Sequence, residues 1–291
     1  MRFLYIILTI YGINSFASTW EESWISGANH NNKNNIANLL KILKTSETGQ
    51  KIITLAKNKY KKNIFDLIKV GNVSLTDTSL KRSFYPGSSD IDYEEISTVV
   101  INKNLNLRDA VLDLSHELTH FTFRKVFNPY QNNFKIKDYI KRTIEGRGGE
   151  ADAFIVECRV RKELFGEDSL NENQCGKIII GNDFSRKRVV SLFYQMGKFY
   201  SKFIDFTNSE NYNYQLANSK NIHFISSAFN LPYPLAAAME FINIKDKICR
   251  TNKMRIQSFK KELRKPASVT KRSPSSSVVS QLENNFSKYC L

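Results

Sequence analysis

Two histidines, His116 and His120, stand four residues apart in the segment SHELTH, and this spacing constrains the local fold more than any other feature of the chain. Four residues of an α-helix turn through about 400°, so both side chains project from one face and can bind the same ion. Glu117 is turned by about 100° from His116 and lies beside that face. Only four histidines occur among the 291 residues, so half of them are in this segment.

The residues around this pair predict a helix. Asn106 can accept a backbone hydrogen bond as its N-cap, and Asp109 suits the positive end of the helix dipole. The helix must end by Asn128, because Pro129 follows. Residues 96–102 are rich in β-branched side chains and predict a strand just before the helix. An apolar stripe completes the pattern: Leu107, Val111, Leu114 and Leu118.

The rest of the chain predicts a mainly helical protein. Hydrophobic spacing predicts helices over residues 35–43, 49–70, 150–165, 186–206 and 234–263, and residues 84–90 (FYPGSSD) predict a loop. Neither a repeat nor a composition change marks a domain boundary. The expected fold class is therefore α+β, predominantly α-helical, with a small sheet and an active-site helix that carries the histidine pair.

The two ends of the chain differ from the middle in composition. Residues 1–17 have a basic start, a short apolar run and a small-x-small end at Ala17, which predicts a cleaved signal peptide rather than a membrane anchor. Residues 18–272 are then expected to form one domain, with a basic helical segment at 244–272. Residues 273–291 are expected to be a Ser-rich tail that begins with a loose linker.

The histidine pair predicts a zinc site. Imidazole nitrogen is a preferred ligand of Zn²⁺, and an acid that immediately follows the first histidine can take a proton from metal-bound water. The pattern is HExxH, the helix motif of zinc metallopeptidases, with His116 and His120 as metal ligands and Glu117 as general base. GxSxG, Walker and GxGxxG patterns are absent.

A catalytic zinc ion needs a third protein ligand and one open position. The first five carboxylates after the motif are Asp138, Glu145, Glu150, Asp152 and Glu157. Glu150 is the favoured ligand, because it begins a helix after the Gly-rich turn GRGG, and that helix can fold back across the first. Glu145, on the near side of the glycines, is the alternative.

Residues 96–164, about a quarter of the chain, resemble the catalytic core of the gluzincin metallopeptidases in HExxH and in the stretch GGEADAF. The resemblance implies a zincin-like core with His116, His120 and Glu150 as ligands, and an edge strand that lines the substrate cleft. Phe154 stands where the thermolysin-like pattern has an Asp four residues after the ligand. Asp152 and Asp113 are therefore the candidates for orienting His116.

Related enzymes often place an oxyanion donor downstream of the ligands. His223 and Tyr233 are the candidates for this role, whereas His30 has no evident role. The expected activity is zinc-dependent hydrolysis of amide bonds in proteins, peptides or peptidoglycan cross-links. The protein is expected to be exported to the periplasm or the extracellular space, without a transmembrane anchor after signal removal.

Four cysteines in an exported chain predict two disulfides. Of the three pairings, Cys158–Cys175 with Cys249–Cys290 is favoured because the partners are close in sequence; free buried thiols are the alternative.

The formal net charge is +15, and much of it lies in residues 244–272. That charge supports an alternative function, a non-catalytic exported protein that binds an anionic cell-envelope component through the basic segment, with HExxH vestigial or structural. Specific nucleic-acid binding is not expected, because no motif for it accompanies the charge.

Overall fold

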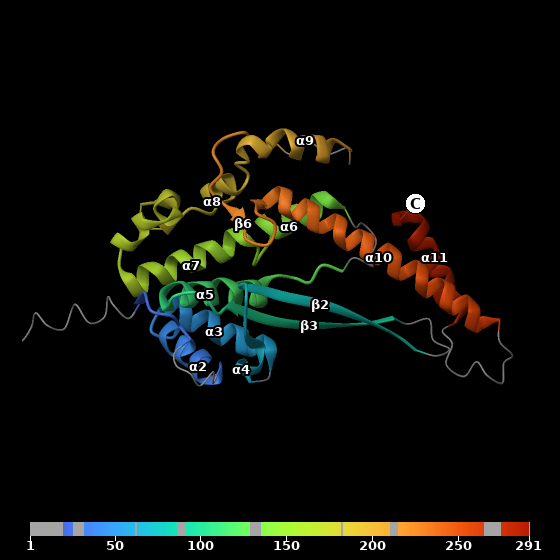
Figure 1. The fold of residues 1–291 in the computed structure, drawn as a ribbon, viewed down its shortest axis with the longest axis horizontal. Helices are drawn as coiled ribbons and strands as arrows, with labels where there is room; N and C mark the ends of the chain where they lie inside the picture. Colours follow the sequence, from blue (N-terminus) through green and yellow to red (C-terminus); the bar gives the residue numbers. More distant parts are fainter. Residues whose placement is uncertain are drawn as a thin grey trace, which may run out of the picture. The chain divides into compact units, whose positions relative to one another are not determined.

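A computed structural model describes residues 20–25, 32–61, 63–85, 91–128, 135–181, 183–209, 215–264 and 275–290 (Figure 1). The predicted signal peptide and His30 lie outside the described residues. The chain divides into two compact units. Unit 1 lies within Met1–Asp77, Ser97–Arg124 and Arg147–Val189, and unit 2 within Thr78–Ile96, Lys125–Gly146 and Val190–Leu291. Because each unit is assembled from separate segments, no single boundary in the sequence marks them.

Four helices build the core of unit 1: α2 (Asn32–Leu43), α3 (Glu47–Tyr60), α5 (Leu107–Phe123) and α7 (Glu150–Phe165). Leucine, isoleucine and valine side chains of these helices pack with Trp24 in one cluster. Ser46 caps α3 by accepting from the amide of Gly49, and Glu163 of α7 accepts from Ser46 and from Thr48. The start of α3 is thereby fastened to α7.

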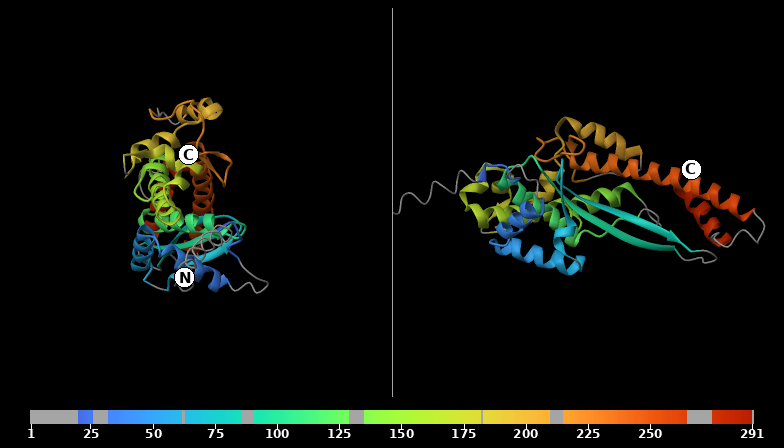
Figure 2. Two further views of the ribbon diagram at one scale, coloured as in Figure 1. Left: turned by 90° about the vertical axis from the view of Figure 1, so that its left-hand side faces the viewer. Right: turned by 60° about the horizontal axis from the view of Figure 1, so that its bottom comes forward.

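The chain also forms a three-stranded sheet. Its strands are β1 (Ile68–Gly71), β2 (Leu75–Phe84) and β3 (Ile91–Asn102), in the order β1-β3-β2. β1 runs parallel to β3, with Ile68 opposite Val99. Figure 2 shows β2 and β3 as long neighbouring ribbons. β3 confirms the strand predicted before the HExxH helix, but it is the central strand, whereas an edge strand was expected there. β2, which the sequence did not predict, is an edge.

Short elements connect the larger ones. Unit 1 contains α4 (Ile64–Leu67), the 3₁₀ helices η1 (Asp168–Glu172) and η2 (Gln174–Ile178), and the strand pair β4 (Ile179–Ile180) and β5 (Asp183–Phe184). Unit 2 contains η3 (Gly197–Phe199) and the strand pair β6 (Ile225–Ser226) and β7 (Leu231–Pro232).

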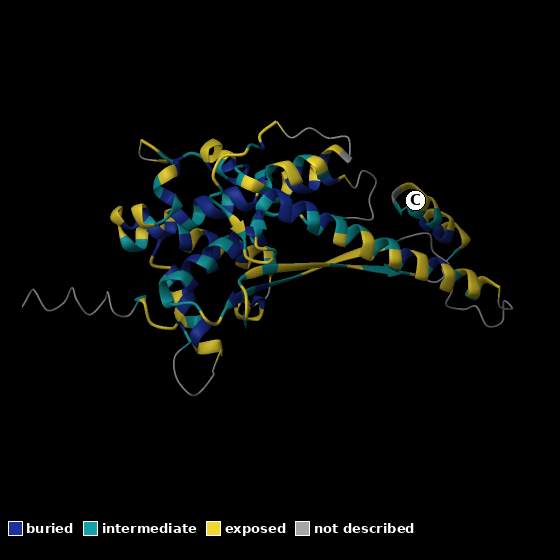
Figure 3. Cartoon of the chain, turned by 45° about the horizontal axis from the view of Figure 1, so that its top comes forward, coloured by how far each residue is buried: buried dark blue, intermediate teal, exposed yellow. Residues whose placement is uncertain are grey.

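Unit 2 is built around the long helix α10 (Tyr233–Leu263), which packs on α6 (Ile136–Glu145) and α11 (Ser276–Cys290). α9 (Tyr200–Ser209) also belongs to unit 2. α8 (Arg186–Phe193) is divided, with its first half in unit 1 and its second half in unit 2. The first turns of α10 are apolar and buried, whereas its later turns are largely exposed (Figure 3). The predicted helix over residues 234–263 is therefore confirmed, and only its first third is a core helix.

Both favoured disulfides are present. Cys158 pairs with Cys175 in unit 1, and Cys249 pairs with Cys290 in unit 2, with Cα atoms 5.5 and 5.6 Å apart. Disulfides of this kind are typical of proteins outside the reducing cytoplasm. Among the described helices, none is both long enough and apolar enough to cross a membrane.

Two predicted helices are wrong in extent. The helix predicted over residues 49–70 ends at Tyr60, where Lys61 adopts a left-handed conformation, and its last residues form β1 because they pair with β3. The helix predicted over residues 186–206 is broken after Phe193: α8 ends there, and η3 and α9 follow from Gly197, which has φ of 50°. The hydrophobic periodicity continues across both breaks and does not reveal them.

The predicted loose linker at the C-terminal end is also wrong from Ser276 onward, because α11 begins there. Val278 and Leu282 of α11 are buried against Ile256 of α10. The serines suggested a linker, but the apolar residues among them have the spacing of a helix face and a partner helix that covers it.

Candidate metal centre

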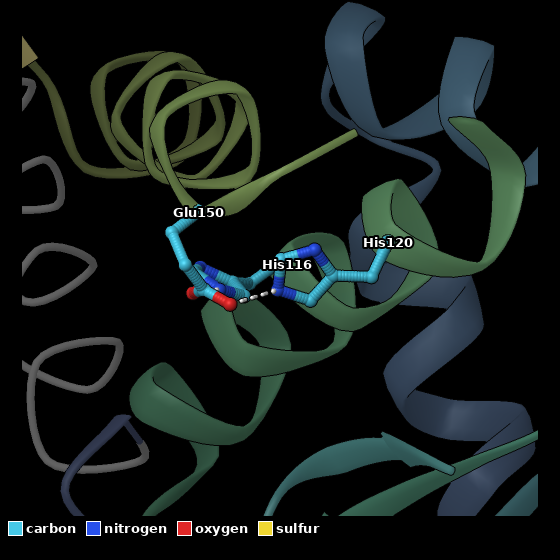
Figure 4. A group of neighbouring side chains, drawn as sticks. All are labelled: His116, His120 and Glu150. Atoms are coloured by element: carbon cyan, nitrogen blue, oxygen red, sulfur yellow. Dashed lines mark hydrogen bonds and ion pairs between the residues drawn. The ribbon is translucent and has the colours of Figure 1, made fainter. Parts of the chain in front are cut away.

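Helices α5 and α7 bring together the three predicted ligands of the metal site. His116 and His120 project from one face of α5, and Glu150 is the first residue of α7 (Figure 4). One ligand atom from each residue can be chosen so that all three lie within 4.8 Å of one another. The Nε2 atoms of His116 and His120 each lie 3.4 Å from an oxygen of Glu150.

The other ring nitrogen of each histidine is held by an outer partner. His116 Nδ1 donates to Glu157 Oε2 at 3.1 Å, and His120 Nδ1 donates to the carbonyl oxygen of Gly148 at 2.8 Å. A backbone carbonyl can only accept, so the bond to Gly148 places a proton on Nδ1 of His120. Both Nε2 atoms are therefore directed at Glu150, which is the arrangement that metal-binding histidines require.

The identity of Glu157 as the partner of His116 corrects the sequence prediction of Asp152 or Asp113. α7 runs antiparallel to α5. The start of α7 therefore lies beside the end of α5, and a residue further along α7 lies beside an earlier residue of α5. Residue 157 lies two turns beyond Glu150, only about 20° away around the axis. Asp152 points elsewhere and accepts from the amide of Gly148 and from Arg186. Asp113 is instead hydrogen-bonded by Ser74.

Gly148 of the GRGG turn cannot be replaced without a change in the backbone. Its φ is +70°, and a Cβ atom there would lie 2.4 Å from the backbone nitrogen of Arg124 and 2.7 Å from the carbonyl carbon of Phe123. Only glycine allows the turn to approach the end of α5 this closely. The sequence identified these glycines as a helix break, but their close approach also supplies the carbonyl that orients His120.

Electrostatics within the group favour an ionised Glu150. Burial raises the pKa of the Glu150 carboxyl, but the charge of His120, hydrogen bonds with both histidines and the charge of Arg124 hold that pKa well below its ordinary value. Burial lowers the pKa of His116, yet hydrogen bonds to Glu150 and Glu157 hold it well above its ordinary value. The centre thus presents an anionic oxygen between two imidazoles.

Arg124, which follows the last residue of α5, is a further member of the group that the sequence did not suggest. Its guanidinium donates to Glu150 Oε1 at 2.9 Å and to the Gly148 carbonyl oxygen at 3.3 Å. About a third of the Arg124 side chain is exposed (34%), whereas Glu150 is almost fully covered (9%). Arg124 therefore orients the Glu150 carboxylate from the solvent side.

Glu117 is buried, with 7% of its surface exposed, and is hydrogen-bonded to the edge strand of the sheet. Thr76 of β2 lies 2.8 Å from both the carbonyl oxygen and Oε2 of Glu117. One helical turn earlier, burial raises the pKa of Asp113 to about 7, although a hydrogen bond from Ser74 opposes the shift. Thr76 of β2 and Ser74 just before it therefore each contribute a hydroxyl group to an acidic side chain of α5.

The remaining candidates lie outside this group. Glu145, the alternative third ligand, belongs to unit 2 and accepts a hydrogen bond from Tyr194 at 2.8 Å. Asp138 is on α6, also in unit 2. His223 and Tyr233, the suggested oxyanion donors, belong to unit 2 as well, where Tyr233 packs edge-on against Phe193.

The donor set fits a zinc ion. At ligand distances of about 2.0–2.1 Å, two donors of a tetrahedral ion are roughly 3.3 Å apart. Each Nε2 lies 3.4 Å from a different oxygen of Glu150, and the three ligand atoms lie within 4.8 Å of one another, so the residues would hold one ion after a small inward movement. Two imidazoles and one carboxylate leave a fourth position for water.

Comparison of the chain with protein-family models, with curated proteins and with solved structures finds no match in any of the three. The functional argument therefore depends on the geometry of this group of residues.

Proposed function

We propose that the protein is an exported, zinc-dependent metallopeptidase with a zincin-like core, in which His116, His120 and Glu150 hold the metal ion. The observation that carries this proposal is the pair of outer hydrogen bonds. Glu157 and the Gly148 carbonyl each hold one Nδ1, so both Nε2 atoms face the Glu150 carboxylate. A chance HExxH helix has no reason to bring an outer partner to each histidine.

Zinc is the metal that best suits these donors. Two imidazoles and one carboxylate, with one position left for water, form a ligand set typical of catalytic zinc. When bound, the ion lowers the pKa of water towards neutrality and polarises the carbonyl group of the substrate. Each histidine ring is already oriented by its outer partner, so binding needs little rearrangement of either ring.

The protein residues would then move the protons. Glu117 follows a metal ligand on the same helix and is buried, where a carboxylate can take a proton from a water molecule. That water adds its oxygen to the carbonyl carbon of an amide. The C–N bond then breaks, and Glu117 returns the proton to the leaving amine. The reaction consumes one water and releases one acid and one amine.

The substrates would be proteins, peptides or peptidoglycan cross-links, which all contain such an amide bond. Two disulfides support a location outside the cytoplasm, in the periplasm or the extracellular space.

Metal binding is tested by zinc content after dialysis and by competition with a chromophoric chelator. Glu150→Gln should lower zinc affinity at least about 10-fold, because a neutral amide replaces the anionic ligand. Glu145→Gln is the matched control: it makes the same chemical change in unit 2, and we expect wild-type affinity. Equal zinc binding by the two variants would remove Glu150 from the site.

Catalysis is tested with Glu117→Gln and a quenched fluorescent peptide library. Glutamine has almost the size of glutamate but cannot accept the proton, so the variant should keep zinc and lose about 100- to 10,000-fold in kcat. Glu283→Gln, on α11 in unit 2, should leave kcat unchanged. A zinc-loaded wild type without hydrolytic activity, or a fully active Glu117→Gln, would refute the enzyme hypothesis.

A second candidate function has its own observation. The later turns of α10 carry five exposed basic residues, and an exposed Arg264 follows as its C-cap; the five are Lys247, Arg250, Lys253, Lys260 and Lys261. Such a surface suits an anionic cell-envelope component. This function predicts salt-sensitive binding to an anionic polymer with no zinc in the wild-type protein, and it is contradicted if Glu117→Gln abolishes a zinc-dependent hydrolysis.

A further inference from the structure

The edge strand β2 faces α5 through two hydroxyl groups. Ser74, just before the strand, and Thr76 within it are separated by two residues, about 7 Å along an extended chain. Asp113 and Glu117 of α5 are separated by four residues, about 6 Å along a helix. The two spacings match, so Ser74 donates to Asp113 and Thr76 donates to Glu117. Strand and helix are therefore held in register by two hydroxyl–carboxylate pairs.

The Thr76 hydroxyl is shared between two acceptors of the same residue. Its Oγ1 atom lies 2.8 Å from the Glu117 carbonyl oxygen and 2.8 Å from Glu117 Oε2. The carbonyl oxygen lies within α5 and already accepts the amide four residues later, as helical carbonyls do. The buried carboxylate oxygen has greater need of a donor, because an ionised oxygen without one costs more when buried.

The two oxygens of Glu117 consequently differ. Oε2 accepts from Thr76, whereas Oε1 has no hydrogen bond from any residue in the described part of the chain. A carboxylate held through one oxygen has its last torsion fixed, which is otherwise soft. The second oxygen then has a defined direction in which to meet a water molecule.

We propose that Thr76 is a positioning residue, which holds the Glu117 carboxylate so that its Oε1 atom takes the proton from the attacking water. This inference rests on the proposed function. It extends the active site to a strand some 40 residues before the motif, in a segment that has no recognised catalytic pattern. A misplacement of about 1 Å at a reacting group can lower the rate about 100-fold, so the loss of one positioning hydrogen bond can lower kcat measurably.

The test compares Thr76→Val, Thr76→Ser and Thr54→Val in the full-length, zinc-loaded protein. Valine keeps the shape of threonine and removes the donor, whereas serine keeps the donor. Thr54 donates to the Gln50 carbonyl oxygen on the exposed face of α3, so Thr54→Val removes an equivalent hydrogen bond away from the site. The measurements are kcat, KM and zinc affinity.

Thr76→Val should lower kcat by about 10- to 100-fold, with KM and zinc affinity within about 2-fold of wild type. Thr76→Ser should recover most of the lost kcat, and Thr54→Val should equal wild type. A purely structural role for Thr76 predicts a different pattern, in which zinc affinity and thermal stability fall together with kcat.

Three results would overturn the inference: a wild-type kcat for Thr76→Val, a loss of kcat that follows a loss of zinc, or no recovery with serine. If Thr76→Val does not fold, Thr76→Cys replaces it as a variant of similar size with a weak donor and should have an intermediate kcat. Absence of activity in both wild type and Thr54→Val would instead refute the proposed function, and the positioning role with it.

Discussion

Units 1 and 2 differ in the kind of polar side chain that they bury. Among the described residues, the buried acidic, basic and histidine side chains all belong to unit 1, and they are Glu117, His120, Glu150 and Arg161. The buried polar residues of unit 2 are Thr207 and Asn252, which carry no charge. Burying an ionisable group lowers stability unless partners compensate for the lost water. The burial of such groups therefore distinguishes unit 1, and three of these residues (Glu117, His120 and Glu150) belong to the proposed site.

The two units are also stabilised in different ways. In unit 1 the disulfide Cys158–Cys175 joins α7 to a neighbouring 3₁₀ segment, on a helix that already packs against α5. In unit 2 the disulfide Cys249–Cys290 joins α10 to α11, whose apolar contact is small. We therefore expect unit 1 to depend on its core and on zinc bound at the proposed site, and unit 2 to depend more on its disulfide.

The largest expected effect is on unit 2. Replacing Cys249 and Cys290 together by serine opens a link between residues 41 apart, which should lower the free energy of unfolding of unit 2 by about 4 kcal/mol. Hydrogen exchange, followed peptide by peptide, measures the loss in each unit. Zinc affinity should not change. A variant whose unit 1 loses as much protection as unit 2 would show that the two units unfold together.

Removal of bound zinc should lower the stability of unit 1. A ligand that binds only the folded state stabilises it by about 2.7 kcal/mol when its free concentration is 100 times its Kd. Dialysis against a chelator should therefore increase hydrogen exchange in α5 and α7 and leave α10 and α11 unaltered. Added zinc should restore the protection. If chelation has no effect on α5, the proposed site does not hold metal in the folded protein.

Loss of an outer partner should have a smaller effect. Glu157→Gln leaves all three ligands in place but weakens the hydrogen bond that orients His116, so zinc affinity should fall about 10- to 100-fold. Glu167→Gln is the control, since Glu167 is exposed, lies just beyond the C-terminal end of α7 and pairs with Lys162. Chelator competition measures both affinities. Equal affinities for the two variants would mean that Glu157 does not support the site.

The smallest expected effect concerns Asp113 and depends on pH. In the folded metal-free protein its pKa is raised to about 7, above the unfolded value near 3.8, so ionisation is disfavoured by folding. Asp113 therefore lowers stability increasingly as pH rises from about 4 towards 7. Asp113→Asn removes this penalty, so its stability relative to wild type should rise with pH, by no more than about 1.4 kcal/mol per unit.

Chemical denaturation in the presence of chelator, at about pH 5 and pH 6, measures that difference. A relative stability that falls with rising pH would contradict the assigned burial of Asp113. Asp109→Asn, in the first turn of α5, serves as the control.

Local signals in the sequence predicted the helices that carry the ligands. Asn106 caps α5 by accepting from the amide of Asp109, as predicted, and α7 spans Glu150 to Phe165 with Gly166 beyond it. Each of these boundaries depends on neighbouring residues alone, namely a capping side chain or a glycine. The favoured disulfide pairing is also confirmed. It was favoured because its partners are close in sequence.

Contacts between distant segments were not predictable in the same way. β2 has no pattern that distinguishes it, since none of its residues is fully buried. Its contact with α5 is made by Thr76, which meets a residue 41 positions later in the sequence. Likewise, Glu157 was one of the first five acidic residues after the motif. Only the antiparallel packing of α7 on α5 brings it, rather than Asp152, to His116.

The sequence by itself therefore determined the histidine pair on one helical face, the acidic residue beside it and the start of the helix that carries Glu150, because helix geometry and capping act over only a few residues. The tertiary structure alone decided which carboxylate meets the histidines, which groups hold their outer nitrogens and which strand holds Glu117. Those outcomes depend on how helices and strands pack, and packing joins residues that no local pattern connects.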